Sequence, residues 1–339
     1  MLKRFWLYLV VVALSCAPAV GQAASIDYTR LFVFGDSLSD SGNAYAATAN
    51  TIPAPPYQGR FSNGPVYAEH MAAQLGLESK PVLAGGTNYA FGGAGTDFSI
   101  PVIFGESPLS LQNQVNLFRA RYLFGNADPH ALYIVYGGNN NLLRGIDAAI
   151  ANPAEAAAIR DSTAAKAAND IVGMVDLLHS AGAQHFLVPN AAPIGFTPAY
   201  APVHDLANSF SADFNLRLAS SVQSLNGPEV ILFDMFGLAQ QVFADPLAYG
   251  LVDVVNPCLT NAQLYGGGGD ICIAPGPNEH LFWDELHFTT AGHAVLANAM
   301  LSALQAPSDA PYPTPLPASI YLFGAAVTVL AAMARRRSL

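Results

Sequence analysis

The chain of 339 residues is rich in hydrophobic side chains (52%) and poor in charged ones (11%). Five of its fourteen Lys and Arg residues lie near the two ends, so residues 25–317 carry nine cationic against 24 anionic side chains, a formal charge of about −15. An acidic body of this kind argues against nucleic-acid binding and against electrostatic docking on anionic lipid. About 290 residues lie between the ends, within the range of one α/β domain with loop insertions.

Residues 1–23 have the pattern of a secretory signal peptide. Lys3 and Arg4 precede an apolar run at 5–14, and small residues follow at 17–24. The apolar run is too short to cross a membrane, which takes about 20 residues. We therefore expect export across a membrane, and a mature body that begins at residue 24.

Five short apolar runs in this body have strand character, each followed by turn residues: 30–34, 87–91, 132–136, 185–188 and 230–233. Continuous apolar runs are typical of strands buried on both faces, as in parallel sheets. Five segments between or after them have helical patterns: 65–75, 110–123, 161–181, 205–225 and 289–304. The alternation predicts an α/β fold over residues 24–305, with a five-stranded parallel sheet between two layers of helices.

Polar or glycine-rich segments follow several of these runs. Ser37 comes directly after the first run, Gly93 after the second and Asn140 after the third, while Asp284 and His287 stand just before the last helix. In a doubly wound sheet, ligands bind beyond the carboxyl ends of the strands. We therefore expect these side chains to meet at one edge of the sheet.

Ser37, His287 and Asp284 are the residue types of a nucleophilic hydrolase site. A serine hydroxyl needs a base within hydrogen-bond reach, and the base needs a third group to hold its tautomer. The three-residue spacing lets Asp284 reach the imidazole of His287 within one turn. Each motif alone is also a common structural feature, a tight turn or a helix start, so the prediction depends on their meeting.

Acyl transfer also needs hydrogen-bond donors aimed at the oxyanion of the tetrahedral intermediate. The candidates are the backbone N–H groups of Ser37 and Gly93 and the side-chain amide of Asn140. Glycine allows close approach of the backbone to the substrate, and asparagine is a donor that does not titrate.

Together these segments resemble, in the same order along the chain, the blocks of the GDSL or SGNH hydrolase family, and most closely its lipase, lecithinase and haemolysin-like branch. The resemblance implies a three-layer α/β/α sandwich of flavodoxin-like topology. It also implies hydrolysis of carboxylic esters through an acyl-enzyme, without metal or cofactor, by Ser37, Gly93, Asn140 and His287, with Asp284 completing the triad. The matching segments are 35–38 (GDSL), 88–94 (NYAFGGA), 138–141 (GNNN) and 284–287 (DELH).

One position departs from the family pattern, because Asn141 stands where the third block usually has aspartate. That aspartate supports the loop of the oxyanion asparagine, and asparagine can accept a hydrogen bond but brings no charge. We expect weaker positioning of Asn140 rather than loss of activity.

Two cysteines, Cys258 and Cys272, remain in the body after Cys16 is assigned to the signal. In an exported protein they predict a disulfide that closes a fifteen-residue loop, worth about 3 kcal/mol by the chain-entropy treatment. Two free buried thiols are the alternative, and no Cys/His spacing indicates a zinc site.

The C-terminal end has a proline-rich linker (306–317), an uncharged segment (318–334) and three arginines (335–337). Their order resembles the PEP-CTERM sorting signals of Gram-negative bacteria, which implies processing by an exosortase and display at the cell surface or in the extracellular matrix. An ordinary membrane anchor through residues 318–334 is the alternative.

The sequence thus predicts an exported serine esterase or lipase acting on carboxylic or lipid esters. A phospholipase or acyltransferase would use the same site. A surface or matrix binding protein on a decayed hydrolase fold is the alternative from another class.

Overall fold

The computed structural model describes residues 27–97, 109–122, 126–263, 265 and 267–305. The expected signal peptide (1–23), the linker (306–317) and the terminal apolar segment (318–339) lie outside the described residues. In the described ranges, no helix combines the length and the apolar character that crossing a membrane requires.

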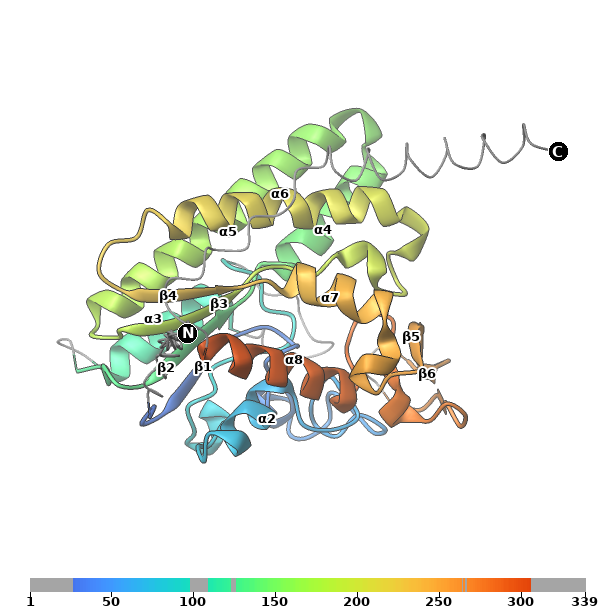
Figure 1. The fold of residues 1–339 in the computed structure, drawn as a ribbon, viewed down its shortest axis with the longest axis horizontal. Helices are drawn as coiled ribbons and strands as arrows, with labels where there is room; N and C mark the ends of the chain where they lie inside the picture. Colours follow the sequence, from blue (N-terminus) through green and yellow to red (C-terminus); the bar gives the residue numbers. More distant parts are fainter. Residues whose placement is uncertain (1–26, 98–108, 123–125, 264, 266, 306–339) are drawn as a thin grey trace, which may run out of the picture.

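The main sheet of the described chain has four parallel strands: β1 (Leu31–Gly35), β2 (Leu132–Tyr136), β3 (His185–Pro189) and β4 (Glu229–Phe233). They lie in the order β1-β2-β3-β4 (Figure 1). Register is regular, with Leu31 opposite Leu132 and His185 opposite Glu229. These strands correspond to four of the five predicted runs.

The remaining predicted strand, at 87–91, does not form. The prediction of a five-stranded sheet is therefore corrected to a sheet of four strands within the described residues. The segment runs beside β1 and makes one parallel bridge, between Val33 and Asn88. Backbone pairing goes on as far as Gly35, whose carbonyl accepts the N–H of Phe91 at 3.1 Å, but it is incomplete. The Gly35 N–H, which a neighbouring strand would accept, donates instead to Gln114 Oε1 at 3.0 Å, and Gln114 Nε2 donates to the Gly35 carbonyl at 2.9 Å.

Helices cover both faces of the sheet, which gives the three layers expected (Figure 1). The bounds of the helices are α1 (Asn43–Ala47), α2 (Tyr67–Gln74), α3 (Leu111–Arg121), α4 (Asn139–Ala151), α5 (Ala156–Ser180), α6 (His204–Val222), α7 (Met235–Ala244) and α8 (Thr290–Leu304). Short 3-10 helices are η1 (Val82–Ala84), η2 (Pro153–Glu155), η3 (Ile194–Phe196), η4 (Ala201–Val203), η5 (Pro246–Tyr249) and η6 (Pro277–Glu279).

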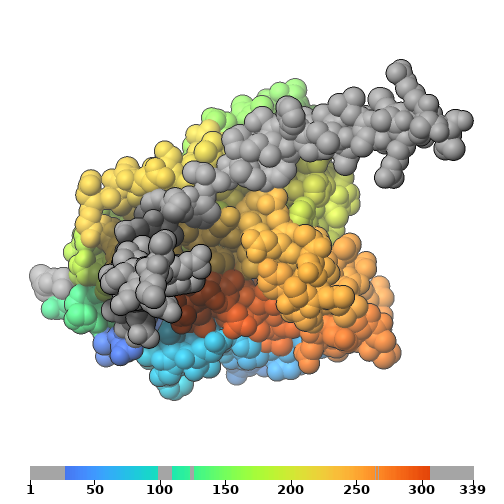
Figure 2. Space-filling model, in the orientation of Figure 1, coloured from blue at the N-terminus to red at the C-terminus, as the bar shows by residue number. Residues whose placement is uncertain are grey.

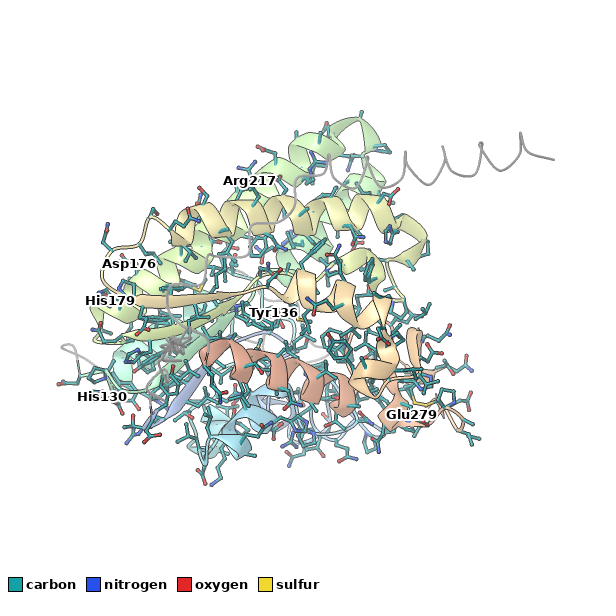
Figure 3. The ribbon with its side chains drawn as sticks, viewed as in Figure 1. His130, Tyr136, Asp176, His179, Arg217 and Glu279 are labelled. Atoms are coloured by element: carbon teal, nitrogen blue, oxygen red, sulfur yellow. A yellow bond between two sulfur atoms is a disulfide. The ribbon has the colours of Figure 1, made fainter. Side chains whose placement is uncertain are left out.

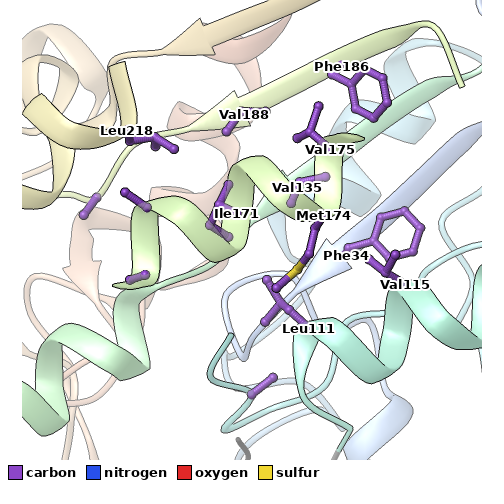
Figure 4. Close-up of a cluster of buried hydrophobic side chains, with 14 of the residues drawn as sticks. Phe34, Leu111, Val115, Val135, Ile171, Met174, Val175, Phe186, Val188 and Leu218 are labelled. Carbon is purple, nitrogen blue, oxygen red and sulfur yellow. The ribbon is translucent and has the colours of Figure 1, made fainter. Parts of the chain in front are cut away.

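Alternate residues of each strand belong to two different hydrophobic clusters, which explains the continuous apolar runs. Phe32 and Phe34 pack with α3, α4, α5 and α6 on one face, the cluster drawn in part in Figure 4. Leu31 and Val33 pack with α2, α7 and α8 on the other. A strand with both faces buried has no polar side, so its sequence does not alternate.

The segment 245–279, in which no helix or strand is predicted, contains short strands. β5 (Asp253–Pro257) pairs in parallel with β8 (His280–Phe282), and β6 (Leu259–Thr260) pairs antiparallel with β7 (Asp270–Ile271). Cys258 and Cys272 form a disulfide between β5 and the end of β7. The disulfide joins two parts of this segment, which forms one end of the molecule and is drawn in orange in Figure 1.

Candidate active site

Ser37 lies on a tight turn directly after β1. The carbonyl of Asp36 accepts the backbone N–H groups of Ser39 and Asp40, each at 3.0 Å, and the Asp36 carboxylate accepts that of Leu38 at 3.1 Å. The turn therefore ends the strand and holds the Ser37 side chain at the carboxyl edge of the sheet.

The structure brings Ser37 together with His287 across 250 residues of sequence. Ser37 Oγ lies 2.8 Å from Nε2 of His287. The other ring nitrogen, Nδ1, lies 3.0 and 2.9 Å from the two carboxylate oxygens of Asp284. With Asp284 on Nδ1, the proton of a neutral imidazole is held there, and Nε2 faces the serine hydroxyl as an acceptor.

A short hairpin between β8 and α8 fixes this arrangement. The Trp283 N–H donates to the His287 carbonyl at 2.7 Å, which closes the turn. Inside it, Asp284 Oδ1 accepts the backbone N–H groups of Leu286 at 2.8 Å and His287 at 2.7 Å. The carboxylate is thus held by its own turn as well as by the imidazole that it orients.

Asp284 receives one further hydrogen bond, which the sequence did not predict. The hydroxyl of Tyr57 donates to Asp284 Oδ2 at 2.9 Å. Burial alone would raise the pKa of Asp284, but the charge of His287 and the hydrogen bonds to the carboxylate outweigh it and hold the pKa below its usual range. Burial and the nearby Asp284 charge raise the pKa of Tyr57, so the phenol stays protonated and keeps donating.

Aromatic side chains flank the His287 ring. Phe61 lies 5.4 Å from it, between ring centroids, and Tyr265 meets it edge-on at 5.7 Å. A Cβ at Gly92 would overlap the Phe61 ring, so the glycine is needed for this packing. No local pattern in the sequence marks Tyr57 or Phe61 for these contacts.

The candidate oxyanion donors lie on the neighbouring segments. Gly93 has φ +77°, a left-handed conformation that glycine adopts without strain. Asn140 stands in the first turn of α4, where the partial positive charge of the helix N-terminus favours a developing anion. Its Nδ2 donates to the Ala94 carbonyl at 3.0 Å, which ties α4 to the Gly93 loop.

Asn141 uses both ends of its amide on Thr96. Its Oδ1 accepts the Thr96 N–H at 2.9 Å, and its Nδ2 donates to Thr96 Oγ1 at 2.9 Å. The hydroxyl in turn donates to Asp170 Oδ2 at 2.5 Å, and Lys166 pairs with that carboxylate at 2.9 Å. A carboxylate therefore does support the loop, but from α5, where no sequence pattern marks it.

Asp36 is a buried neighbour of Ser37. Burial raises its pKa to about 6, although hydrogen bonds from Leu38 and Asn139 lower it in part. The carboxyl group accepts the Asn139 side chain at 3.3 Å and so links the first loop to the start of α4.

One cluster in the described ranges has a metal-like composition. Ligand atoms of Cys258, Cys272 and His280 lie within 4.8 Å of one another. Both sulfurs are engaged in the disulfide, and thiolates are the form that binds metal, so these residues do not fit a metal centre.

Comparison with known proteins shows which family the chain resembles. Residues 31–300 match the family described as GDSL-like Lipase/Acylhydrolase. Esterase EstA of Pseudomonas aeruginosa is 30% identical over 88% of this chain, and the match covers 50% of its own length. The protein named GDSL esterase/lipase 6 of Arabidopsis thaliana is 25% identical over 86% of this chain and 91% of its own. Lipase 1 of Photorhabdus luminescens is 23% identical over 90% of this chain and 54% of its own length.

The match to the family spans β1 to α8 and so includes every candidate residue described above. The chain spans about half the length of the Pseudomonas esterase and of the Photorhabdus lipase that it resembles. It belongs to the GDSL-like lipase/acylhydrolase family.

Proposed function

We propose that this protein hydrolyses carboxylic esters with Ser37 as the nucleophile. The observation that carries the proposal is the continuous contact from Ser37 Oγ through both nitrogens of His287 to Asp284, at 2.8 to 3.0 Å. This is the order of groups that activates a serine hydroxyl.

The reaction has two halves. His287 Nε2 takes the proton of Ser37 as Oγ attacks the ester carbonyl carbon, and it then gives that proton to the departing alkoxide, which leaves as the alcohol. The acyl group remains on Ser37. A water molecule, deprotonated by the same Nε2, attacks the acyl carbon, releases the carboxylic acid and returns the proton to Oγ.

The tetrahedral intermediates carry a negative oxygen in both halves. We assign its stabilisation to the backbone N–H groups of Ser37 and Gly93 and to the Asn140 side chain. Each well-placed donor of this kind is worth about 3 kcal/mol in the transition state. The position of Asn140 at the N-terminus of α4 supports this assignment.

The substrate class follows from the relatives' names, esterase and lipase. We propose carboxylic esters, including those of lipids, as substrates. Phospholipid acyl hydrolysis and transfer of the acyl group to another alcohol would use the same residues, because only the group that attacks the acyl-enzyme differs.

We also propose that the protein is exported and sorted at its C-terminal end, by the patterns at 1–23 and 306–339. Processing by an exosortase would remove the apolar segment, whereas a retained segment would hold the body at a membrane. N-terminal sequencing and the intact mass of the protein recovered from a producing cell test both cleavages.

Release of p-nitrophenol from acyl esters of short and long chain tests the activity. We expect turnover by the wild type, loss of about a thousandfold or more in Ser37→Ala, and wild-type turnover in Ser180→Ala, which alters an exposed serine at the end of α5. A fluorophosphonate probe should label the wild type and the Ser180→Ala variant but not Ser37→Ala. No release of p-nitrophenol by the wild type above the uncatalysed rate, together with no labelling at Ser37, would instead identify a binding protein.

A further inference from the structure

The exposed large apolar side chains are concentrated in one segment of the chain. Of the eight that are exposed in the described residues, five lie between 247 and 273: Leu247 (73%), Val252 (52%), Val255 (57%), Ile271 (45%) and Ile273 (93%). Single exposed apolar residues are ordinary on a protein surface, whereas a concentration of them marks an interaction site. We call these five residues the apolar end.

The apolar end rests on a stiff framework. Val255 is on β5 and Ile271 is on β7, and the disulfide joins the chain just beyond each of them. The backbone N–H of Cys272 also donates to the Cys258 carbonyl at 2.8 Å, and Ile273 is the next residue in the chain. Figure 2 shows the segment that contains them, in orange, as part of the outer surface at that end. The side chains are therefore presented to solvent by fixed backbone.

The same segment adjoins the proposed active site. Tyr265 contacts the rings of both His287 and Phe61, at 5.7 and 4.9 Å between centroids. The Cys258 N–H donates to the Phe282 carbonyl at 3.0 Å, next to the hairpin that carries the imidazole. An apolar surface that met this end would lie beside the edge where Ser37 is found.

The charge around the apolar end restricts which kinds of surface can bind there. Residues 218–334 contain no Lys or Arg, and the apolar end lies among acidic side chains such as Asp245, Asp270 and Glu279, the last labelled in Figure 3. A surface with negative headgroups would be repelled. A second copy of this chain in a symmetric contact would bring the same acidic side chains face to face, which also disfavours association.

We propose that the apolar end docks on a lipid surface without net negative charge, zwitterionic or uncharged, and so delivers aggregated lipid esters to Ser37. The proposal rests on the ester hydrolase function proposed above. Insertion of apolar side chains supplies the binding energy, and the acidic surroundings select against anionic lipid.

Co-flotation with vesicles tests the docking. The wild type should float with vesicles of phosphatidylcholine and bind less to an equimolar mixture of phosphatidylcholine and phosphatidylglycerol, with the difference shrinking in high salt. Leu247→Glu/Ile273→Glu should weaken binding to phosphatidylcholine by roughly tenfold or more, since two of the most exposed apolar side chains are lost.

A matched control is Ile150→Glu/Leu216→Glu, which adds the same charge at exposed apolar residues on α4 and α6. It should bind vesicles within about twofold of wild type. Both double variants should keep wild-type turnover of soluble p-nitrophenyl butyrate, which shows that they fold. Only Leu247→Glu/Ile273→Glu should lose turnover of an uncharged triacylglycerol emulsion. Ile273→Glu alone should show a smaller effect in the same direction.

The docking proposal is wrong if the wild type does not float, or if both double variants float alike. It is also wrong if Leu247→Glu/Ile273→Glu only dissociates a dimer in sedimentation, because the apolar end would then be an interface between two copies. If instead the proposed hydrolase function is wrong, the result is different. The Ser37→Ala variant would float with the vesicles, and its turnover of the soluble ester would equal that of the wild type.

Discussion

Tyr57 and Asp284, 227 residues apart in sequence, are joined by a hydrogen bond of 2.9 Å from the phenol to the carboxylate. Tyr57 is 4% exposed and packs edge-on against Trp283, so its ring is fixed by the same hairpin that carries Asp284. The acid that orients His287 is therefore also held from the loop between α1 and α2.

Tyr57→Phe should lower kcat for a soluble ester by roughly ten- to 150-fold, because a hydrogen bond to a charged group is worth about 1.5–3 kcal/mol. The ring contacts remain, so the unfolding midpoint should change little by comparison. The measurement is kcat and KM on p-nitrophenyl butyrate beside thermal unfolding.

Tyr249→Phe is the matched control, since that hydroxyl bonds to Gln241 on a different surface. It should leave kcat unchanged. If Tyr57→Phe also has the wild-type kcat, the phenol does not position Asp284 in the reaction.

Asn141→Asp should lower turnover by several-fold rather than improve it, although aspartate is usual in the family. An aspartate cannot donate to Thr96 Oγ1, and its charge would face Asp170 across the hydroxyl that bonds to both side chains. The double variant Asn141→Asp/Asp170→Asn exchanges the two groups and should recover most of the lost turnover. Additive losses in the double-mutant cycle would show that the two side chains do not act through Thr96.

Much of the fold could be predicted because the strands are buried on both faces, which leaves a continuous apolar run in the sequence. The expected run at 87–91 pairs only in part with β1, because the distant Gln114 accepts the Gly35 N–H that a full strand partner would accept. α4 was missed because it begins directly after two glycines with three asparagines, residues typical of loops, while Gly138 in fact precedes the helix with φ +95°.

The residues of the site also fall into two groups, those that a short sequence motif marks and those that no motif marks. Ser37, Asp284 and His287 each stand in a short local motif, so sequence could bring them forward as candidates, and their catalytic roles remain predictions until tested. Tyr57 and Asp170 reach the site through single side-chain contacts across 227 and 74 residues. Contacts of that kind leave no periodic or spaced pattern in one sequence.

Replacing both cysteines, as in Cys258→Ser/Cys272→Ser, should lower the free energy of unfolding by about 3 kcal/mol, because the bridge closes a loop of about fifteen residues. Turnover should fall as well, since the bridged segment carries Tyr265 against His287. The measurements are urea unfolding and ester turnover with and without reductant. Reductant should affect the wild type only; an equal response of the variant would contradict the role of this disulfide.

His293 should make stability fall in acid. It is fully buried on α8 between Tyr67 and Phe288, and within the described residues neither ring nitrogen has a hydrogen-bond partner. Burial, with smaller contributions from His70 and His287, lowers its pKa to about 3. The unfolded chain binds this proton near its ordinary pKa of about 6.5, so the folded state loses stability as the pH falls between those two values, by several kcal/mol in all.

Asp36 acts in the opposite direction, because its folded pKa of about 6 lies above the ordinary value and its ionisation costs stability as the pH rises. The effect of His293 is therefore read as a difference between wild type and His293→Leu, measured by urea unfolding from about pH 7 to about pH 4. The variant removes two unpaired nitrogens, so it should be at least as stable as the wild type at neutral pH and increasingly more stable in acid. Two parallel stability curves would mean that the imidazole gains a proton or a partner inside the folded protein, and that its burial does not drive acid unfolding.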